Sequence, residues 1–283
     1  MNYFTLDGHS TTEWGIGLSA GGAYDAPARK GESISVPGRS GNIWVDDGSY
    51  ENVMLTYPCW MSEGFDSNID DFRTYLSKHS DQYYKLSDTY HPNEFRLGRY
   101  AGPFSTTPGT RNLSGRFDVV FDCQPQRFLN SGAEWKNLEI PNINPEQAVA
   151  NLFTETNPTG FRTYAMLCVA GTGEETLNFS FRNTDLDIWN VVSLYDYSAG
   201  KYYYIDLLNF IVYESTVADS ADISGLARLD SWLRCANAHG RNGEFENDLA
   251  LFEGENIINN STLWHSGHNT LTHFSIMTRY WTI

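Results

Sequence analysis

Residues 116–123 alternate between apolar and polar side chains. Phe117, Val119 and Phe121 fall on one side of an extended backbone, and most of the residues between them are charged. A period of two residues is that of a β-strand with one buried face. Aromatic residues make up 14% of the sequence and 24 residues are glycine, and these types favour sheets and turns respectively. The sequence therefore predicts a mainly β protein.

One helix is predicted in the first half of the chain, at about residues 67–79. Apolar side chains recur there at helical spacing. Ser67 and Asp70 occupy the positions of an N-terminal capping box, and Lys78 and His79 place positive charge at the C-terminal end. We expect this helix to pack against a sheet. The predicted strands around it are residues 33–36, 42–45, 51–57, 83–86, 94–100 and 116–123.

A connector rich in proline and polar residues begins after Cys123 and separates two predicted domains. We expect an N-terminal β-sandwich domain at residues 1–135 and a C-terminal β-sandwich domain, of the jelly-roll kind, at residues 136–283. Short strands at the spacing of the second half are typical of a sandwich. Residues 219–238 are ambiguous, and a short helix is one interpretation of them. The predicted strand-like segments of the second half are residues 161–169, 176–182, 188–197, 202–213, 249–252 and 273–281.

The chain is acidic, with 35 Asp and Glu residues against 19 Lys and Arg residues and a formal net charge of −16. Both halves share this balance: 11 basic and 17 acidic residues precede Trp135, and 8 basic and 18 acidic residues follow it. A stable, sequence-reading grip on nucleic acid usually needs clustered basic residues, so this class of function is excluded. No apolar run approaches the ~20 residues of a membrane span, and the N-terminus lacks the regions of a signal peptide. The sequence predicts neither membrane anchoring nor export by the usual signal.

The cysteines and histidines do not form a recognisable metal motif. None of the four cysteines is in a C-x-x-C spacing, and we predict buried free thiols rather than a zinc site or a disulfide framework. His265, His268 and His273 cluster in one segment, but spacings of three and five residues fit no common metal motif. Solvated or hydrogen-bonded histidines are the preferred interpretation. The four cysteines are Cys59, Cys123, Cys168 and Cys235.

Motifs that carry catalysis are sparse. The chain has no Walker loop, no H-E-x-x-H, no G-x-S-x-G and no EF-hand loop. Asp46, Asp47 and Glu51 form the densest acidic patch, but an Asp47-Gly48 hairpin turn and a solvated rim account for them without a bound cation. We predict no enzymatic activity, no metal and no cofactor.

Two further groups of residues have both a functional and a structural interpretation. The pairs Glu174-Glu175 and Glu244 with Glu246 would suit glycoside hydrolysis only at a fixed separation across a cleft, and charged turns are the simpler interpretation. Exposed aromatic residues in the second half would stack on sugar rings or anchor a protein interface, whereas alternation buries at least half of them. These aromatic residues are Trp189, Tyr195, Tyr197 and Tyr202 to Tyr204.

Six strings of residues carry a resemblance to a known family. They are VPGRSGN at residues 36–42, YENV at 50–53, YKLSDTY at 84–90, GRFDVVFDCQP at 115–125, LFEGENII at 251–258 and RYWTI at 279–283. In order and spacing they resemble the distal tail protein (Dit) family of long-tailed phages. Thr278 stands where that family often has proline, Tyr280 replaces a tryptophan, and residues 214–240 are longer than the usual connection.

The resemblance implies a structural protein that catalyses no reaction. Members of the family have a β-sandwich with a helix and an extended hairpin, followed by a galectin-like β-sandwich. Six copies form a ring at the tail tip, with the tail tube protein on one face and the tail-associated hub or lysin protein on the other. The outer domains carry receptor-binding proteins or other baseplate parts. Such a protein is made in the host cytoplasm and becomes part of the virion.

The resemblance also implies where the subunits of such a ring meet. We expect the hairpin at about Asp88 to Arg99 to be an extended inter-subunit arm, because it carries aromatic side chains and arginines that pair with carboxylates. An ordinary surface hairpin is the alternative. The expected interface residues are Tyr90, Phe95, Arg96, Arg99 and Tyr100.

The acidity of the chain has a specific consequence in a ring of this kind. DNA passes through the channel only in transit, and an acidic channel wall would let its phosphates slide past. A second class of function stays open for the C-terminal domain, namely a carbohydrate-binding module that recognises host surface glycans through stacked aromatic residues. That alternative depends on analogy of fold, which does not fix function.

Overall fold

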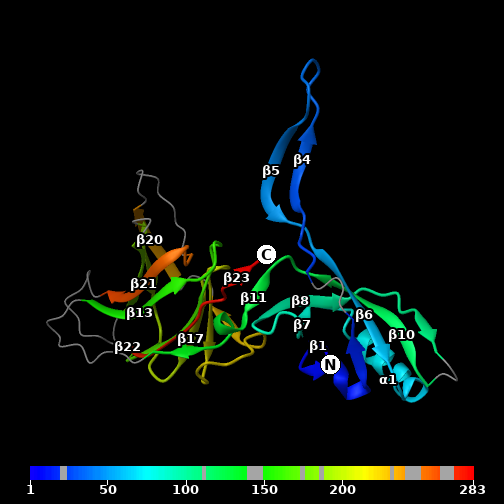
Figure 1. Cartoon of the computed structure of the whole chain (residues 1–283). Coiled ribbons are helices and arrows are strands. Elements are labelled where there is room, and N and C mark those ends of the chain that lie inside the picture. The colour runs from blue at the N-terminus through cyan, green and yellow to red at the C-terminus, as the bar shows by residue number, and fades with distance from the viewer. Residues whose placement is uncertain are drawn as a thin grey trace. The chain divides into compact units, whose positions relative to one another are not determined.

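The chain is mainly β, as predicted, and divides into two compact units. The structure, a computed structural model, describes residues 1–19, 24–109, 113–138, 149–172, 176–184, 188–229, 233–239, 250–261 and 271–283 (Figure 1). Unit 1 comprises Met1–Asn130 with Ile283, and unit 2 comprises Ser131–Thr282. The division thus falls between residues 130 and 131, whereas the sequence predicts it between residues 135 and 136. No helix in the described ranges is long and apolar enough to cross a membrane.

Unit 1 is built on one antiparallel sheet with the strand order β2-β1-β7-β8-β10-β6-β3, in which β9 also pairs with β10 and β11 with β8. The alternation at residues 116–123 is confirmed, because Phe117, Val119 and Phe121 are buried on one face of β10. The strands are β1 (Phe4–Leu6), β2 (His9–Ser10), β3 (Ile16–Leu18), β6 (Val53–Met61), β7 (Tyr84–Asp88), β8 (Glu94–Tyr100), β9 (Thr106–Pro108), β10 (Gly115–Cys123) and β11 (Arg127–Leu129).

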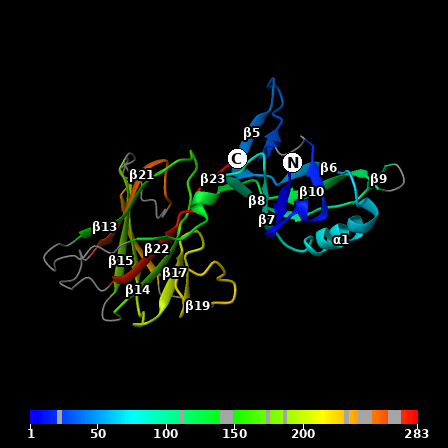
Figure 2. The same ribbon diagram turned by 60° about the horizontal axis from the view of Figure 1, so that its bottom comes forward.

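The helix α1 (Phe65–Lys78) covers the buried face of this sheet (Figure 2). Phe72 lies at its centre, fully buried, with ring contacts to Phe4 on β1 and to Phe117 on β10. A short 3-10 turn, η1 (Thr11–Trp14), packs against the same ring through Trp14. The predicted helix is therefore confirmed, and it closes the hydrophobic core of unit 1.

The predicted cap of α1 is wrong. The helix begins at Phe65, and its N-cap is Gly64 in the left-handed region, with φ of 67° and no side-chain cap. Ser67 already lies inside the first turn, where its hydroxyl donates to the Gly64 carbonyl oxygen at 3.0 Å. The chain must reverse sharply before the helix, and glycine adopts positive φ without a steric penalty. A capping box at Ser67 and Asp70 is thereby ruled out.

Strands β4 (Arg29–Ile34) and β5 (Ile43–Tyr50) form a separate two-stranded sheet, which we call the arm (Figure 1). Its tip holds the P-G-R-x-G string, and Gly38 and Gly41 there have φ of 81° and 82°. The hairpin turn predicted at Asp47-Gly48 is wrong, because both residues lie within β5. Gly48 has φ of 81° and donates its N–H to Asp46 Oδ1 at 3.0 Å, near an irregular register between β4 and β5.

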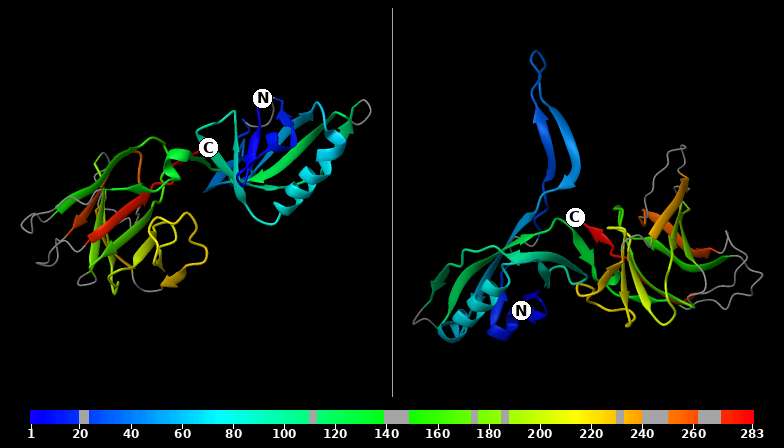
Figure 3. Two further views of the ribbon diagram at one scale, coloured as in Figure 1. Left: turned by 90° about the horizontal axis from the view of Figure 1, so that it is seen from below. Right: turned by 180° about the vertical axis from the view of Figure 1, so that it is seen from behind.

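Unit 2 is a β-sandwich of two antiparallel sheets (Figure 3). One has the order β12-β22-β14-β17-β18-β19 and the other β13-β21-β15-β16-β20. The rings of Phe179 and Phe274, one from each sheet, lie 5.7 Å apart in the core. The strands are β12 (Lys136–Asn137), β13 (Val149–Asn157), β14 (Met166–Gly171), β15 (Leu177–Asn183), β16 (Ile188–Leu194), β17 (Tyr202–Asp206), β18 (Ile211–Ser215), β19 (Ala227–Leu229), β20 (Leu233–His239), β21 (Gly254–Ser261), β22 (Leu271–Met277) and β23 (Trp281–Thr282), and a 3-10 turn η3 spans Asn130–Gly132.

Two predictions for unit 2 need correction. The single run at residues 202–213 is two strands, β17 and β18, joined by a turn in which Phe210 has φ of 54°. The short helix considered for residues 219–238 is absent from the described part of that segment, which contributes β19 and part of β20 instead. The pairing of β19 with β18 and of β20 with β16 favours an extended backbone there, and it outweighs the weak local preference for a helix.

Candidate assembly surface

The arm exposes nearly every residue that it contains. All six residues of β4 are exposed, and in β5 only Tyr50 is partly buried. Large apolar side chains are among them: Trp44 is 55% exposed and Val45 is 49% exposed. An isolated two-stranded hairpin is marginally stable in water, and contiguous exposed apolar residues mark contact sites. The arm is thus a candidate contact site for another chain.

The register of the arm places three of its apolar residues on one face. Ile34 lies opposite Ile43, and Val45 lies opposite Glu32. Because side chains alternate along a strand, Ile34, Ile43 and Val45 share a face. Trp44 lies on the other face, and a Cβ added to Gly31 would come within 2.6 Å of its indole ring. The indole therefore fits only because residue 31 has no side chain.

Polar contacts at the base hold the two strands of the arm together. Arg29 donates to Asp46 Oδ2 through Nε at 2.8 Å and approaches it through Nη2 at 2.7 Å. The Arg29 guanidinium also lies 4.6 Å from the centre of the Tyr50 ring. The hydrogen bond from Arg29 lowers the pKa of Asp46, and the same bond raises the pKa of Arg29. This pairing uses Asp46 in a structural contact, so it supports the interpretation without a cation.

The hairpin at residues 88–99 is not an extended arm. Its strands β7 and β8 lie inside the main sheet of unit 1, with β1 paired to β7 and β10 paired to β8. Both strands therefore have neighbours on each side, and Leu86, with partly buried Tyr84 and Tyr100, contributes to the core of unit 1. The sequence identified a hairpin correctly but assigned the projecting role to the wrong one.

The two arginines expected at an interface have partners within the chain. Arg96 is only 5% exposed and donates to the carbonyl oxygens of Pro125 at 3.0 Å and Asp25 at 3.2 Å. Burial lowers the pKa of Arg96. Arg99 is exposed and forms an ion pair with Asp122 at 2.9 Å. Of the two, only Arg99 offers a guanidinium that solvent or another chain can reach.

The three aromatic residues expected at that interface are partly buried. The Phe95 ring stacks on the Phe128 ring at 5.4 Å, and the Lys85 ammonium lies 4.4 Å from its centre. Tyr90 and Tyr100 pack against the core of unit 1. The structure thus places four of the five expected residues on β8 and Tyr90 in the turn between β7 and β8, and their role at an interface stays a prediction.

Most of the other candidate residues have structural roles or lie outside the described residues. Cys59, Cys123 and Cys168 are buried free thiols, as predicted. Tyr203 and Tyr204 are fully buried, which excludes them from stacking on a sugar, and Tyr197 is nearly so. The carboxylates at residues 174–175, 244 and 246, the side chains of Trp189 and Cys235, and His265 and His268 lie outside the described residues.

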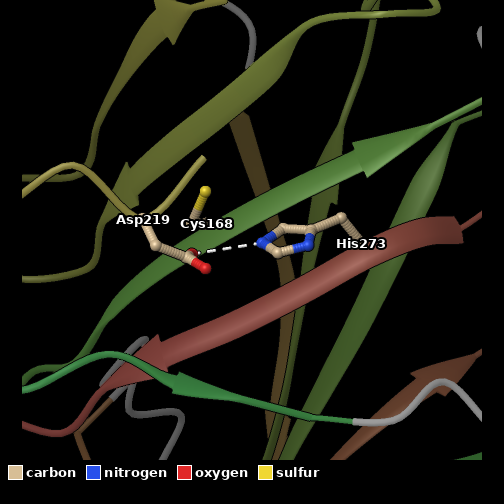
Figure 4. A group of neighbouring side chains, drawn as sticks. All are labelled: Cys168, Asp219 and His273. Carbon is tan, nitrogen blue, oxygen red and sulfur yellow. Dashed lines mark hydrogen bonds and ion pairs between the residues drawn. The ribbon is translucent and has the colours of Figure 1, made fainter. Parts of the chain in front are cut away.

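One group of metal-ligating side chains occurs in unit 2, among the residues for which placement is given. Cys168, Asp219 and His273 each offer one ligand atom, and these atoms lie within 4.8 Å of one another (Figure 4). Burial raises the pKa of the Cys168 thiol to about 12. A reactive nucleophilic cysteine has a lowered pKa and some exposure, so the group does not have the properties of a cysteine hydrolase site. No sequence motif indicates this group, because the three residues come from separate segments.

Comparison with known proteins identifies the fold. No model of a known protein family and no curated protein sequence matches the chain. Two structures of the phage P2 baseplate in its activated conformation, with Ca and with Sr, are similar at TM-scores of 0.43 and 0.44 and identities of 11% and 10%. The matched regions span 93% and 91% of this chain, and 99% and 98% of the respective baseplate chains. The crystal structure of the Dit protein (gp 19.1) of phage SPP1 is similar at a TM-score of 0.56 and 11% identity, over 92% of this chain and 98% of that chain. The chain therefore has a Dit-like fold.

Proposed function

We propose that this protein is a structural component of a phage tail tip, in which six copies form a ring that joins the tail tube to the tail-associated hub protein. The exposed arm carries the proposal, because its apolar face has no partner within the chain's described part. The Dit-like fold supports it: the Dit protein of SPP1 is described as a paradigm of the hub adsorption apparatus in phages that infect Gram-positive bacteria.

The arm takes the inter-subunit role that the sequence assigned to residues 88–99. A closed ring needs heterologous contacts, in which one surface of a subunit meets a different surface of the next. A projecting two-stranded ribbon suits this requirement. It is separate from the main sheet of unit 1, and it presents Ile34, Ile43 and Val45 together. Burying these side chains against a neighbouring copy would contribute about 25 cal/mol per Å² of apolar surface.

The remaining parts of the function follow from a ring at the tail tip. One ring face would contact the tail tube and the other the hub protein, while unit 2 would carry receptor-binding proteins or other baseplate parts. The protein would act in the virion, without catalysing a reaction and without a membrane. DNA would pass through the channel, whose wall we expect to be acidic because the residues before Trp135 include 17 acidic and 11 basic side chains; most of the net charge of −16 belongs to the second half of the chain.

The proposal is tested by the mass of the full chain in solution, measured by light scattering at several concentrations with and without the tail tube and hub proteins. Negative-stain images of the same samples would show whether rings form. We expect six-fold rings, at least in the presence of the tail partners. A protein that stays monomeric or dimeric with both partners present would contradict the proposal.

Variants of the arm test whether its apolar face is needed for ring formation. Ile34→Ser together with Val45→Ser removes two of the three apolar side chains of this face and leaves the Arg29–Asp46 pair in place. We expect the double variant to fold and to lose ring formation. Leu208→Ser is the matched control, because Leu208 is 60% exposed and lies in unit 2. Rings that persist in the arm variant would exclude the arm as the inter-subunit contact.

A further inference from the structure

We propose that Cys168, Asp219 and His273 form a site for one borderline-soft divalent metal ion, with Zn²⁺ as the best fit. The group lies in unit 2, on the outer face of the sheet that contains β14 and β22. No catalytic role is attached to it. The ion would tie the loop after β18 to the sheet.

The pairing of β14 with β22 places the thiol and the imidazole on one face. Cys168 lies opposite Ser275, and Val169 lies opposite Phe274. Phe274 points into the sandwich core, where its ring meets that of Phe179, so its neighbours in sequence point outward. Cys168 and His273 therefore share the outer face, and they are diagonal neighbours because His273 lies opposite Ala170.

The loop after β18 brings the carboxylate to the same point. The Tyr204 hydroxyl on β17 donates to the Val217 carbonyl oxygen at 2.8 Å and accepts from the Ser220 N–H at 2.7 Å. These two bonds clamp the backbone on either side of Asp219. Trp135 adds a third anchor, because its Nε1–H donates to the Ser220 carbonyl oxygen at 3.0 Å. Asp219 has φ of 51° there, and the clamp holds this rarely populated conformation.

The donor atoms are grouped closely enough for one tetrahedral zinc ion to draw them together. His273 Nε2 lies 3.1 Å from Asp219 Oδ1, and all three donor atoms lie within 4.8 Å of one another. Metal–ligand distances of about 2.0–2.3 Å at tetrahedral angles put donor atoms roughly 3.3–3.6 Å apart. Small rotations of side chains would reach that geometry. Figure 4 shows Asp219 and His273 facing each other from the loop and β22, with Cys168 beside them on β14.

The chemistry of the three donors favours zinc over calcium or magnesium. A thiolate and an imidazole are ligands for zinc and its neighbours in the transition series, whereas calcium and magnesium take oxygen ligands. Binding would release the Cys168 proton to solvent and form a sulfur–metal bond. His273 and Asp219 are partly exposed, at 16% and 24% of their side chains, so a water molecule can take the fourth position. Ser275 Oγ, 3.1 Å from His273 Nε2, is placed to hydrogen-bond that water.

Cobalt is the probe for this site, because tetrahedral Co²⁺ gives visible absorption bands and a thiolate ligand adds a charge-transfer band in the near ultraviolet. The full chain would be stripped with a chelator, dialysed and titrated with Co²⁺. We expect saturation at one equivalent, and displacement by Zn²⁺. Cys168→Ser should abolish the charge-transfer band, and His273→Gln should weaken binding by more than the roughly 10- to 100-fold caused by loss of an outer-sphere partner.

Two controls make the result decisive. Cys123→Ser replaces another buried thiol, in unit 1, and should leave the band unchanged. Asp219→Asn changes a partly exposed loop residue and should leave the fold intact. Zn²⁺ at a hundredfold excess over its Kd should raise the unfolding temperature of unit 2 by roughly 5–10 °C, and this variant should lose most of that rise. A wild-type chain without a cobalt band, a band that survives Cys168→Ser, or a thermal shift unchanged in Asp219→Asn would overturn the proposal.

Discussion

Replacing Asp88 with alanine should unfold unit 1 at a markedly lower temperature. Asp88 ends β7, and its side chain is only 8% exposed. One carboxylate oxygen accepts from the Tyr57 hydroxyl at 2.7 Å, and the other accepts the backbone N–H groups of Tyr90 and His91 at 2.9 Å each. One carboxylate thus fixes the turn between β7 and β8 and holds a core tyrosine of β6.

The magnitude depends mainly on Tyr57. The backbone groups at the turn are partly buried and regain water when the carboxylate is removed, so their loss costs little. The Tyr57 side chain is 2% exposed, and its hydroxyl would be left without an acceptor. A hydrogen bond to a charged group contributes about 1.5–3 kcal/mol, and an orphaned buried donor costs about 1–3 kcal/mol. Together these give roughly 3–5 kcal/mol, or a fall in unfolding temperature of about 10–20 °C for a unit of this size.

Calorimetry of the full chain measures the fall, and hydrogen exchange read by mass spectrometry locates it in β6 and β7. Tyr57→Phe is the diagnostic partner, because it removes the hydroxyl that Asp88→Ala orphans. In the Asp88→Ala background, Tyr57→Phe should restore part of the lost stability, while in the wild type it should be destabilising. Equal effects of Tyr57→Phe in both backgrounds would refute the reasoning, since independent residues give additive changes.

Two further outcomes follow from contacts elsewhere in the chain. Gly115→Ala should destabilise unit 1 by about 1–3 kcal/mol in urea unfolding, because the added Cβ would come within 2.2 Å of the Phe65 ring; Gly225→Ala, which meets nothing within 4 Å, should be neutral or slightly stabilising. On the arm, the pKa of Asp46 is lowered from 3.8, first by the Arg29 hydrogen bond. The Arg29–Asp46 ion pair therefore contributes fully to the folding stability of the arm above pH 3.8. This contribution is lost as the pH falls through the pKa of Asp46 in the folded protein. A nuclear magnetic resonance titration of Asp46 would check this, and a lowered pKa that persists unchanged at high salt would contradict an exposed pair.

The sequence predicts those elements of the fold that bury one face. Residues 116–123 alternate because β10 has α1 on one side and solvent on the other. The helix is predictable for the same reason, since Phe72 and Leu76 must both reach that core. Its first residue is not predictable from a capping signal, because Gly64 acts through backbone conformation and offers no side chain to recognise.

The cluster in unit 2 shows a different limit of sequence reasoning. The histidine spacing around residue 273 concerns neighbours along the chain, whereas the partners of His273 are a strand neighbour and a distant loop residue. Only the register of β14 with β22 makes Cys168 adjacent to it. A pattern search restricted to one segment cannot find ligands that a sheet assembles across three.

The sequence predicts strands at residues 33–36 and 42–45 but does not identify them as the arm, because a strand whose apolar face awaits another chain has the same pattern as a strand whose apolar face is buried within its own chain. In β10 the buried face selects apolar residues at every second position, and that selection is the signal. In β4 and β5 both faces are exposed in the single chain, yet Ile34, Ile43 and Val45 share one face as in a core strand. Among the described residues of unit 1, no element covers that face, since all three side chains are at least 38% exposed. Apolar residues ordered in this way would be costly on a surface that stays in water, so their arrangement argues that a second chain supplies the missing layer.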